Sequence, residues 1–240
     1  MCGRFLLTAP VEALRRLFGV SDSPNLMARY NIAPTQTTGV VRLKPAGGGR
    51  ELAALRWGLV PSWAKDVAVG AGLINGRSDG VATKPSFRAA YRQRRCLVPA
   101  DGFYEWAPGP AKAPKQPYLV RRADRGTFAF AGIWERWQGD GQTVQSFAII
   151  TTDANKILAA IHHRMPVILD PRDYAAWLDI GNERAQELLK PAPDGLLQAI
   201  AVSTRVNAVR NDDPGLIEPV AVAREKPEAA SRAPAQGSLF

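Results

Sequence analysis

The alternation of hydrophobic and polar residues along the chain is mostly that of short β-strands separated by turns. It predicts strands over 39–43, 52–57, 96–98, 118–121, 127–134, 144–151 and 197–203. Two turns are rich in glycine: Ala46-Gly47-Gly48-Gly49 separates the first two strands, and Gly139-Asp140-Gly141 separates 127–134 from 144–151. Turns of this composition join antiparallel hairpins.

Four segments have the spacing of short helices instead. The first covers 10–18, where Val11, Leu14, Leu17 and Phe18 share one face, with Thr8 as the expected cap and Gly19 as the stop. The others cover 153–161, 171–178 with Asp170 as the cap, and 183–189, which Pro191 ends.

This order is not the strict strand–helix alternation of a parallel α/β fold. It predicts an α+β domain with a mainly antiparallel, barrel-like β core flanked by short helices. No internal repeat and no strong linker interrupts the chain before about residue 224, so we expect one domain over 1–224. The remaining residues, 225–240, are small, polar and rich in proline and alanine, which is typical of a disordered tail.

Composition narrows the class of protein. The chain has 240 residues, of which 46% are hydrophobic and 22% charged, as in an ordinary packed protein. Its two cysteines are too few for a scaffold held together by disulfides. No segment resembles a signal peptide or a membrane span. We therefore expect a soluble, cytoplasmic protein. The net charge of +9 favours polyanionic partners, although many basic proteins do not bind nucleic acid.

Cys2 is the most informative candidate for chemistry. Initiator methionine is usually removed before a residue as small as cysteine, which leaves an α-amine (pKa ~8) and a thiol (pKa ~8.5) on one residue. The amine can condense with an aldehyde to an imine, and the thiol can then close onto the same carbon as a thiazolidine. No internal cysteine can do this. The alternative is that Cys2 is simply a small buried residue.

Glu105 and His162 are the candidates for proton transfer. Glu105 stands between aromatic residues in Gly102-Phe103-Tyr104-Glu105-Trp106, and an apolar pocket would raise the pKa of its carboxyl group. The alternative is an outward-facing side chain on an alternating strand. His162 and His163 are the two histidines of the chain, and histidine is a general acid and base at neutral pH. A zinc site with Cys2 and Cys96 is the rival interpretation, but the spacing matches no common ligand pattern, so no metal is expected.

Further polar and aromatic residues suit the binding of a nucleic acid. The side-chain amide of Asn75 can hydrogen-bond to a carbonyl or hydroxyl group, and the guanidinium group of Arg77 can bind a phosphate. A basic stretch follows, with Lys84, Arg88, Arg92, Arg94 and Arg95, for which a solvated helix face is the plain alternative. Trp57 and Trp63 offer ring faces for bases, although tryptophan more often packs in a core.

Together these motifs resemble the SRAP family, the abasic-site processing proteins also called SOS response-associated peptidases. The resemblance covers residues 2 to about 222. The motifs that carry it are Met1-Cys2-Gly3-Arg4-Phe5, Tyr30-Asn31-Ile32-Ala33-Pro34, Arg56-Trp57-Gly58-Leu59-Val60-Pro61, Ile74-Asn75-Gly76-Arg77, Gly102-Phe103-Tyr104-Glu105-Trp106, His162-His163-Arg164-Met165-Pro166 and Val202-Ser203 with Val206-Asn207.

The resemblance implies a sensor of abasic sites in single-stranded DNA. Cys2 would join the ring-opened sugar through a thiazolidine, with lyase activity as a side reaction. Asn75 would orient the sugar, Glu105 would assist ring opening and proton transfer, and His162 would be the acid and base during imine formation. The DNA contacts it implies are Arg4, Arg77, Arg88, Thr151, Arg164 and, by stacking, Trp63. It implies no cofactor and a monomer.

The chain departs from the family pattern near Asn75. The family usually has Asn-Ala-Arg followed by Glu, whereas here Gly76 replaces the alanine and Asp79 stands at the acidic position. The loop between Trp63 and Leu73 is also unusually apolar and rich in glycine. Two other functions stay open from the residues: a cysteine peptidase that uses Cys2 and His162, and a non-catalytic module that binds single-stranded nucleic acid.

The chain ends in Gln236-Gly237-Ser238-Leu239-Phe240, which resembles the short peptide that docks into the bacterial sliding clamp. A flexible tether with apolar anchors at its end would raise the local concentration of the protein at the replication fork. We therefore expect the clamp as a second partner, contacted through Gln236, Leu239 and Phe240.

Overall fold

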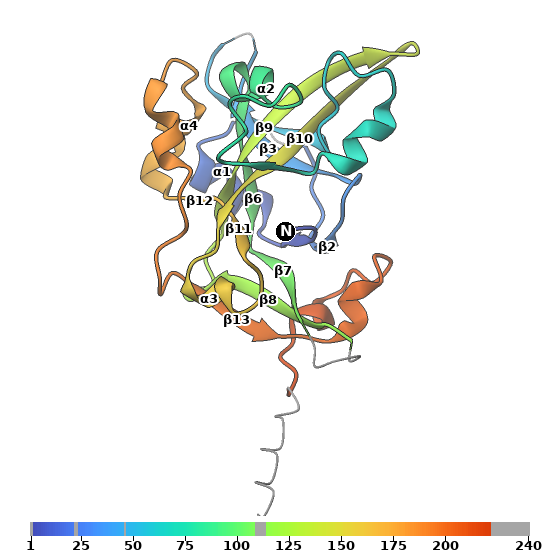
Figure 1. Cartoon of the computed structure of the whole chain (residues 1–240), viewed down its shortest axis with the longest axis vertical. Helices are drawn as coiled ribbons and strands as arrows, with labels where there is room; N and C mark the ends of the chain where they lie inside the picture. Colours follow the sequence, from blue (N-terminus) through green and yellow to red (C-terminus); the bar gives the residue numbers. More distant parts are fainter. Residues whose placement is uncertain (1, 22–23, 46, 109–113, 222–240) are drawn as a thin grey trace, which may run out of the picture.

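Five strands hydrogen-bond in a closed ring in the computed structural model, which describes residues 2–21, 24–45, 47–108 and 114–221. The ring runs β10–β4–β3–β6–β9 and returns to β10 (Figure 1). Its strands are β3 (Thr37–Leu43), β4 (Arg50–Trp57), β6 (Arg95–Ala100), β9 (Phe128–Gly139) and β10 (Gln142–Asp153). All neighbours are antiparallel except β4 and β10, which are parallel. The predicted α+β fold with a barrel-like, mainly antiparallel core is confirmed.

Short strands extend this barrel on its outside. β5 (Asn75–Arg77) runs parallel to β10, β11 (Arg164–Pro166) pairs antiparallel with β10, and β12 (Ile168–Leu169) pairs with β9. A separate antiparallel sheet has the order β13–β8–β7–β1–β2. Its strands are β1 (Phe5–Leu7), β2 (Arg29–Ile32), β7 (Gly102–Ala107), β8 (Gln116–Arg122) and β13 (Leu197–Ala201).

The helices are short and lie around the strands (Figure 1). They are α1 (Val11–Phe18), α2 (Arg88–Gln93), α3 (Lys156–Ala159) and α4 (Tyr174–Leu178), with 3₁₀ turns at Val67–Gly72, Pro171–Asp173, Glu183–Leu188, Thr204–Asn207 and Pro214–Ile217. None of the helices in the described ranges has the length and apolar character needed to cross a membrane.

Aromatic residues pack where the barrel meets the second sheet. The ring of Phe5 packs edge-to-face against Trp57 and Phe130, with ring centroids 5.0 and 6.0 Å apart. The rings of Phe103 and Phe130 pack in the same way, with their centroids 5.9 Å apart. All four side chains are fully buried. Because buried aromatic side chains contribute large apolar areas to a core, Phe5 anchors the beginning of the chain in the middle of the fold.

Most predicted elements are present, and the differences have identifiable causes. Gly19 ends α1 in the left-handed conformation (φ 63°), but Thr8 does not cap this helix, because its backbone and hydroxyl groups donate to Asp101 instead. The predicted helix over 153–161 is wrong at its start: pairing with β11 extends β10 through Asp153, and the helix begins only after Asn155. The segment 183–189 forms a 3₁₀ turn rather than an α-helix.

The basic stretch before β6 is not a uniformly solvated helix face. Arg88 and Arg92 are exposed on α2, but Arg94 pairs with the buried Glu135 at 2.7 Å. Arg95 is buried and donates to the carbonyl of Asp179. Residues 222–240 lie outside the described ranges, so the domain boundary near residue 224 and the clamp-binding end stay predictions.

We expect Gly58→Ala to destabilise the fold, because Gly58 supports the loop that carries Trp63. Gly58 has φ 117°, and a Cβ atom there would lie 2.5 Å from the carbonyl oxygen of Gly70. The substitution should lower the free energy of unfolding by about 2 kcal/mol or more in urea titrations.

Gly76→Ala is the matched control for this substitution. Its Cβ atom would lie 3.4 Å or more from its neighbours, and Gly76 does not have a positive φ. Equal stability of the two variants would contradict the assignment of a tight backbone contact at Gly58.

Candidate active site

The site is built around Cys2, which the anchoring of β1 places inside the fold. The backbone N–H of Tyr104 donates to the carbonyl of Arg4 at 2.9 Å, so the residues before Phe5 continue alongside β7. Cys2 is fully buried, and its carbonyl oxygen accepts a hydrogen bond from Asn75 Nδ2 at 2.8 Å. This contact spans 73 positions of the sequence and brings Asn75 next to the start of the chain.

The backbone of Asn75 is held in β5, in addition to the contact that its side chain makes with Cys2. β5 pairs with β10 in the register Ile149 to Asn75 and Thr151 to Arg77. The Oδ1 atom of Asn75 is buried and has no hydrogen-bond partner within the described residues. Since a buried polar atom is normally satisfied, this oxygen is available to accept a hydrogen bond from a bound molecule.

Glu105 lies on β7, with only 3% of its surface exposed. The outward-facing alternative is therefore wrong, and the expected apolar environment is present. Burial raises the pKa of the Glu105 carboxyl group, because a carboxylate loses its hydration inside the protein. A protonated carboxyl group can donate a proton near neutral pH.

The thiol of Cys2 is strongly affected by this environment. Burial raises the pKa of the Cys2 thiol above its usual range, and the nearby Glu105 carboxylate raises it further. The buried Cys2 is therefore a neutral thiol, which is a weaker nucleophile than a thiolate. Cys96, the other free cysteine, is also buried, and burial raises its pKa.

His162 lies in the turn between α3 and β11, where it is half-buried. Its Nδ1 atom accepts a hydrogen bond from the backbone N–H of Arg164 at 3.0 Å, so neutral His162 carries its proton on Nε2. The carbonyl of Arg164 lies 3.2 Å from the same Nδ1 atom and can accept its proton when the ring is charged. Both protonation states thus have a partner.

The pKa of His162 is lowered by burial first, and then by the positive charges of the amino terminus, His163 and Lys115. The His163 ring stacks on the His162 ring, with the ring centroids 4.4 Å apart and an angle of 22° between the ring planes. Burial is thus the leading cause of the pKa shift of His162, as it is for Cys2 and Glu105.

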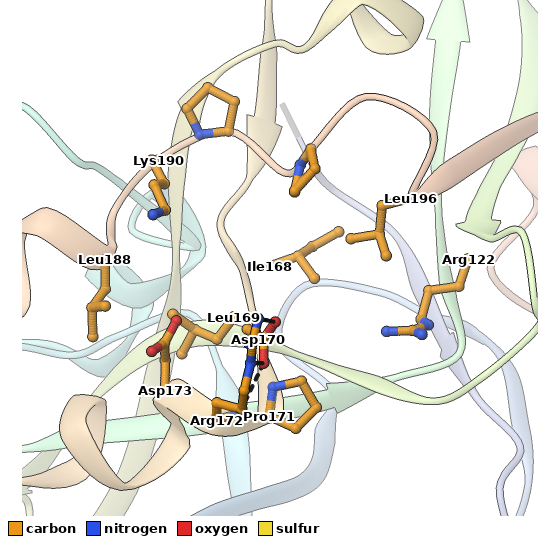
Figure 2. Close-up of a pocket in the computed structure, with 12 residues that line it drawn as sticks. Arg122, Ile168, Leu169, Asp170, Pro171, Arg172, Asp173, Leu188, Lys190 and Leu196 are labelled. Carbon is orange, nitrogen blue, oxygen red and sulfur yellow. Dashed lines mark hydrogen bonds and ion pairs between the residues drawn. The ribbon is translucent and has the colours of Figure 1, made fainter.

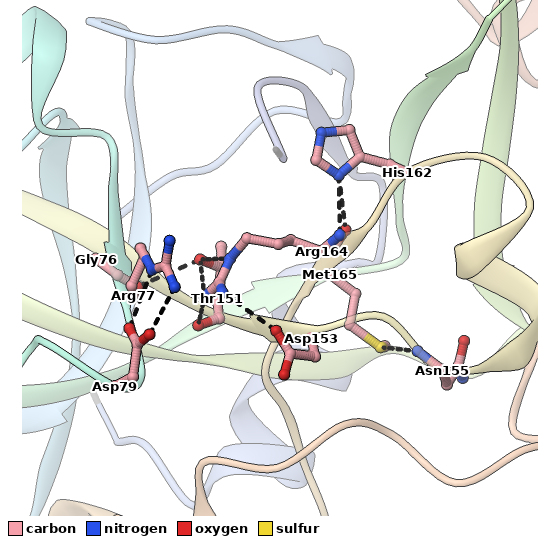
Figure 3. A network of polar contacts seen from close by, with 9 residues as sticks. All are labelled: Gly76, Arg77, Asp79, Thr151, Asp153, Asn155, His162, Arg164 and Met165. Carbon is pink, nitrogen blue, oxygen red and sulfur yellow. Dashed lines mark hydrogen bonds and ion pairs between the residues drawn. The ribbon is translucent and has the colours of Figure 1, made fainter.

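A polar network connects His162, through Arg164 and Thr151, with the backbone of β5 at Gly76 (Figure 3). Arg164 donates to the carbonyl of Thr151 at 2.6 Å, and the same carbonyl accepts from the backbone of Ser78 at 2.8 Å. Thr151 and Arg164 expose almost no surface, so their role in this structure is to join β10 to β5 and β11. Direct contact of these two residues with DNA stays a prediction.

Arg77 and Arg4 are placed very differently. Arg77 is exposed, and its guanidinium group makes two hydrogen bonds to Asp79, at 2.6 and 3.0 Å. Arg4 is held inside the protein by Asn31 Oδ1 at 2.9 Å and the Val206 carbonyl at 2.8 Å. The guanidinium group of Arg77 can therefore bind a phosphate once its hydrogen bonds to Asp79 break. The guanidinium group of Arg4 already has protein partners.

Asn31 and Trp106 are supporting residues to which the sequence pattern assigned no role. Asn31 is fully buried, and its amide donates to three carbonyls of the segment 206–211, the shortest contact being 2.7 Å to Asn211. Trp106 donates to Asn207 Oδ1 at 2.8 Å, and its ring lies 6.0 Å from the Arg4 guanidinium carbon. The signal for Asn31 was a polar residue inside an apolar strand, flanked by Tyr30 and Ile32.

Two predicted DNA contacts lie away from this centre. Trp63 is 62% exposed in the loop that follows β4, whereas Trp57 is fully buried and belongs to the core. Arg88 is exposed at the first residue of α2 and follows Phe87, whose ring lies close to Gly76 of β5.

Comparisons with known proteins agree on one family. The family model described as SOS response associated peptidase (SRAP) matches residues 1–209. The abasic site processing protein YoqW of Bacillus subtilis is 37% identical over 225 residues, covering 91% of this chain and 99% of YoqW. The abasic site processing protein HMCES of Gallus gallus is 33% identical over 267 residues, covering 92% of this chain and 78% of HMCES. A crystal structure of a Bacteroides thetaiotaomicron protein superimposes with a TM-score of 0.81 at 26% identity, over 92% of this chain and all of that protein.

We expect His163→Phe to raise the pKa of His162. Phenylalanine keeps an aromatic ring against His162 but removes the positive charge that favours the neutral form of His162. Titration of the ring by NMR in the intact protein measures the shift directly. The exposed Lys190→Gln variant, which lies at a different cavity, is the control; an unchanged or lowered His162 pKa in His163→Phe would contradict this coupling.

Proposed function

Because the chain belongs to the SOS response associated peptidase (SRAP) family, we propose that it processes abasic sites in single-stranded DNA. Two of its relatives, YoqW and HMCES, are named abasic site processing proteins. The proposed product is a covalent thiazolidine between Cys2, after removal of Met1, and the ring-opened abasic sugar. The observation that supports it most is the burial of Cys2 against Asn75 and beside Glu105.

The neutral state of the thiol favours an order of events in which the amine acts first. The α-amine of Cys2 attacks the aldehyde carbon, and loss of one water gives an imine. The Cys2 thiol then adds across the C=N bond: sulfur bonds to carbon, and the thiol proton is transferred to nitrogen. The two steps together release one water and close the five-membered ring.

Glu105 and His162 supply the proton transfers that these steps need. The raised pKa of Glu105 suits it to donate a proton to the leaving hydroxyl group and to take one from the thiol. The lowered pKa of His162 keeps its ring neutral, so that it can act as a base at neutral pH. If the imine loses a proton from the neighbouring sugar carbon before ring closure, β-elimination cuts the strand, which would account for a lyase side reaction.

The charge of the protein and the placement of its polar groups support this substrate class. Asn75 Oδ1 is positioned to accept a hydrogen bond from the sugar beside Cys2. The exposed Arg77 suits a flanking phosphate, and the exposed Trp63 suits base stacking. An unpaired lesion strand needs no base flipping, so a single strand is the favoured substrate.

A cysteine peptidase is less well supported by the geometry. Such an enzyme uses a thiolate activated by a neighbouring histidine, whereas burial and the Glu105 carboxylate favour the neutral thiol of Cys2. A purely non-catalytic binding module would not need the buried Glu105 or the positioned His162. Self-removal of Met1 stays the one proteolytic step that we propose for this site.

We expect Cys2→Ala to lose the heat-stable adduct with an abasic single-stranded oligonucleotide. The alanine variant keeps a free α-amine, so it should still form an imine that borohydride traps. A variant with an extra residue before Cys2 should lose both products, because the amine is displaced. Denaturing gels and intact-mass measurement distinguish these species.

Cys96→Ala is the matched control for this experiment, since Cys96 is a buried cysteine that belongs to the core. It should retain both products. A heat-stable adduct in Cys2→Ala, or an adduct mapped to another residue, would contradict the proposed chemistry.

We expect Glu105→Gln to slow adduct formation by about 100-fold or more, the usual contribution of a general acid or base. Burial raises the pKa of Glu105, so the wild-type pH–rate profile should contain a component that falls with rising pH above the ordinary range of a glutamate, in addition to the rise that deprotonation of the α-amine causes in both proteins. The glutamine variant should lack this pH dependence, because its side chain does not titrate. Single-turnover rates between pH 5 and pH 8 measure both effects, with Glu135→Gln as a second buried glutamate outside the site. Retention of the wild-type pH profile in Glu105→Gln would exclude this role.

A further inference from the structure

Two of the cavities outside the proposed site differ in how their positive charges are balanced. The cavity drawn in Figure 2 lies between β12 and the segment 188–196 and has a volume of about 240 Å³. Its arginines are neutralised within the chain: Arg172 pairs with Asp170 at 2.9 Å, and Arg122 pairs with Asp124 at 2.5 Å. Both arginines are therefore already paired, which leaves the exposed Lys190 as the remaining cation in the described lining of this cavity.

The other cavity, of about 530 Å³, lies between the beginning of α1 and the turn that joins β8 to β9. This is a size typical of small-molecule sites. Its lining is largely aliphatic and comes from β1, the beginning of α1, β8 and the segment near 217: Leu6, Ala9, Pro10, Ala13, Leu119 and Ile217. Such a surface favours an aliphatic group over water.

Arg121 and Arg125 face this cavity without being neutralised. Neither side chain forms an ion pair or hydrogen bond with any described residue, and the Nε atom of Arg121 is buried without a partner. Burial lowers the pKa of Arg121, the positive charge of Arg125 lowers it further, and Glu218 acts in the opposite direction. Two adjacent guanidinium groups, one of them partly desolvated, therefore lack a close counterion.

The acidic residue of this cavity does not supply the missing counterion. Asp101 Oδ2 accepts from the Thr8 backbone at 2.5 Å, the Thr8 hydroxyl at 2.8 Å and the Ala9 backbone at 2.9 Å. Its Oδ1 atom accepts from the Thr127 hydroxyl at 2.6 Å. The carboxylate is thus occupied in holding the residues after β1, and the two arginines remain available to an external anion.

We propose that this cavity binds an amphipathic anion, in which a carboxylate or phosphate group is joined to an aliphatic chain. The anionic group would pair with Arg121 and Arg125, and the chain would lie against the aliphatic lining. Among the described residues, no aromatic side chain lines the cavity, so this part of it lacks the stacking surface that a nucleobase would use.

The cavity lies at the opposite end of β1 from the reactive residue. Leu6 and Thr8 line it, whereas Cys2 precedes the strand and contacts Asn75. Ligand binding can therefore be measured without any reaction at Cys2, and the proposal does not depend on the proposed DNA chemistry.

Titration of the intact protein with octanoate and with octyl phosphate, followed by calorimetry and NMR, tests the proposal. Both or one of these probes should bind, and the comparison identifies the preferred anionic group. Arg121→Gln and Arg125→Gln should each weaken binding by at least about tenfold, the usual effect of one charge-assisted hydrogen bond. Arg172→Gln is the matched control, because Arg172 is an exposed arginine at the other cavity, and it should bind as the wild type does.

Arg121→Gln should keep or raise the melting temperature, because it removes a partly buried charge that has no close counterion. An unchanged or raised melting temperature would show that the variant is folded, so that weaker binding reflects the lost arginine. Three results would overturn the proposal: no binding of either probe to the wild type, equal binding to wild type and Arg121→Gln, or acetate and inorganic phosphate binding as tightly as the octyl compounds. Octanol binding as tightly as octanoate would exclude a role for the arginines.

Discussion

The rest of the structure depends on the burial of Phe5 where the barrel meets the second sheet. Its ring packs against Trp57 of the barrel and Phe130 of β9, while its backbone pairs with Phe103 of β7. Chain ends are commonly mobile. Here an aromatic anchor three residues from Cys2 removes that freedom, so Cys2 has a defined position inside the fold.

Burial has the same electrostatic consequence for each of the three candidate side chains: it favours the uncharged form. It raises the pKa of Glu105 and of the Cys2 thiol, and it lowers the pKa of His162. Condensation of an amine with an aldehyde needs an uncharged amine together with groups that donate and accept protons. A site that disfavours net charge meets these requirements better than a site built to stabilise a thiolate.

Supporting residues hold this arrangement through contacts that are remote in the sequence. Asn31 ties the segment 206–211 to β2 and receives a hydrogen bond from Arg4. Arg164 and Thr151 join the turn that contains His162 to the strand that contains Asn75 and Arg77. Several arginines of this basic chain are therefore structural, and the positive charge of the sequence overstates the number of side chains free to contact DNA.

The sequence by itself determined the features that depend on local order: Cys2 at the beginning of the chain, Glu105 between aromatic residues, the adjacent histidines, and the hairpins at glycine-rich turns. Only the tertiary structure decided that Asn75 lies against Cys2, that Thr151 and Arg164 are buried, and that Thr8 binds Asp101 instead of capping α1. Strand periodicity reports which face of a strand is buried, but not which strands become neighbours or in what register. Those choices depend on packing across the whole barrel, which no short stretch of sequence contains.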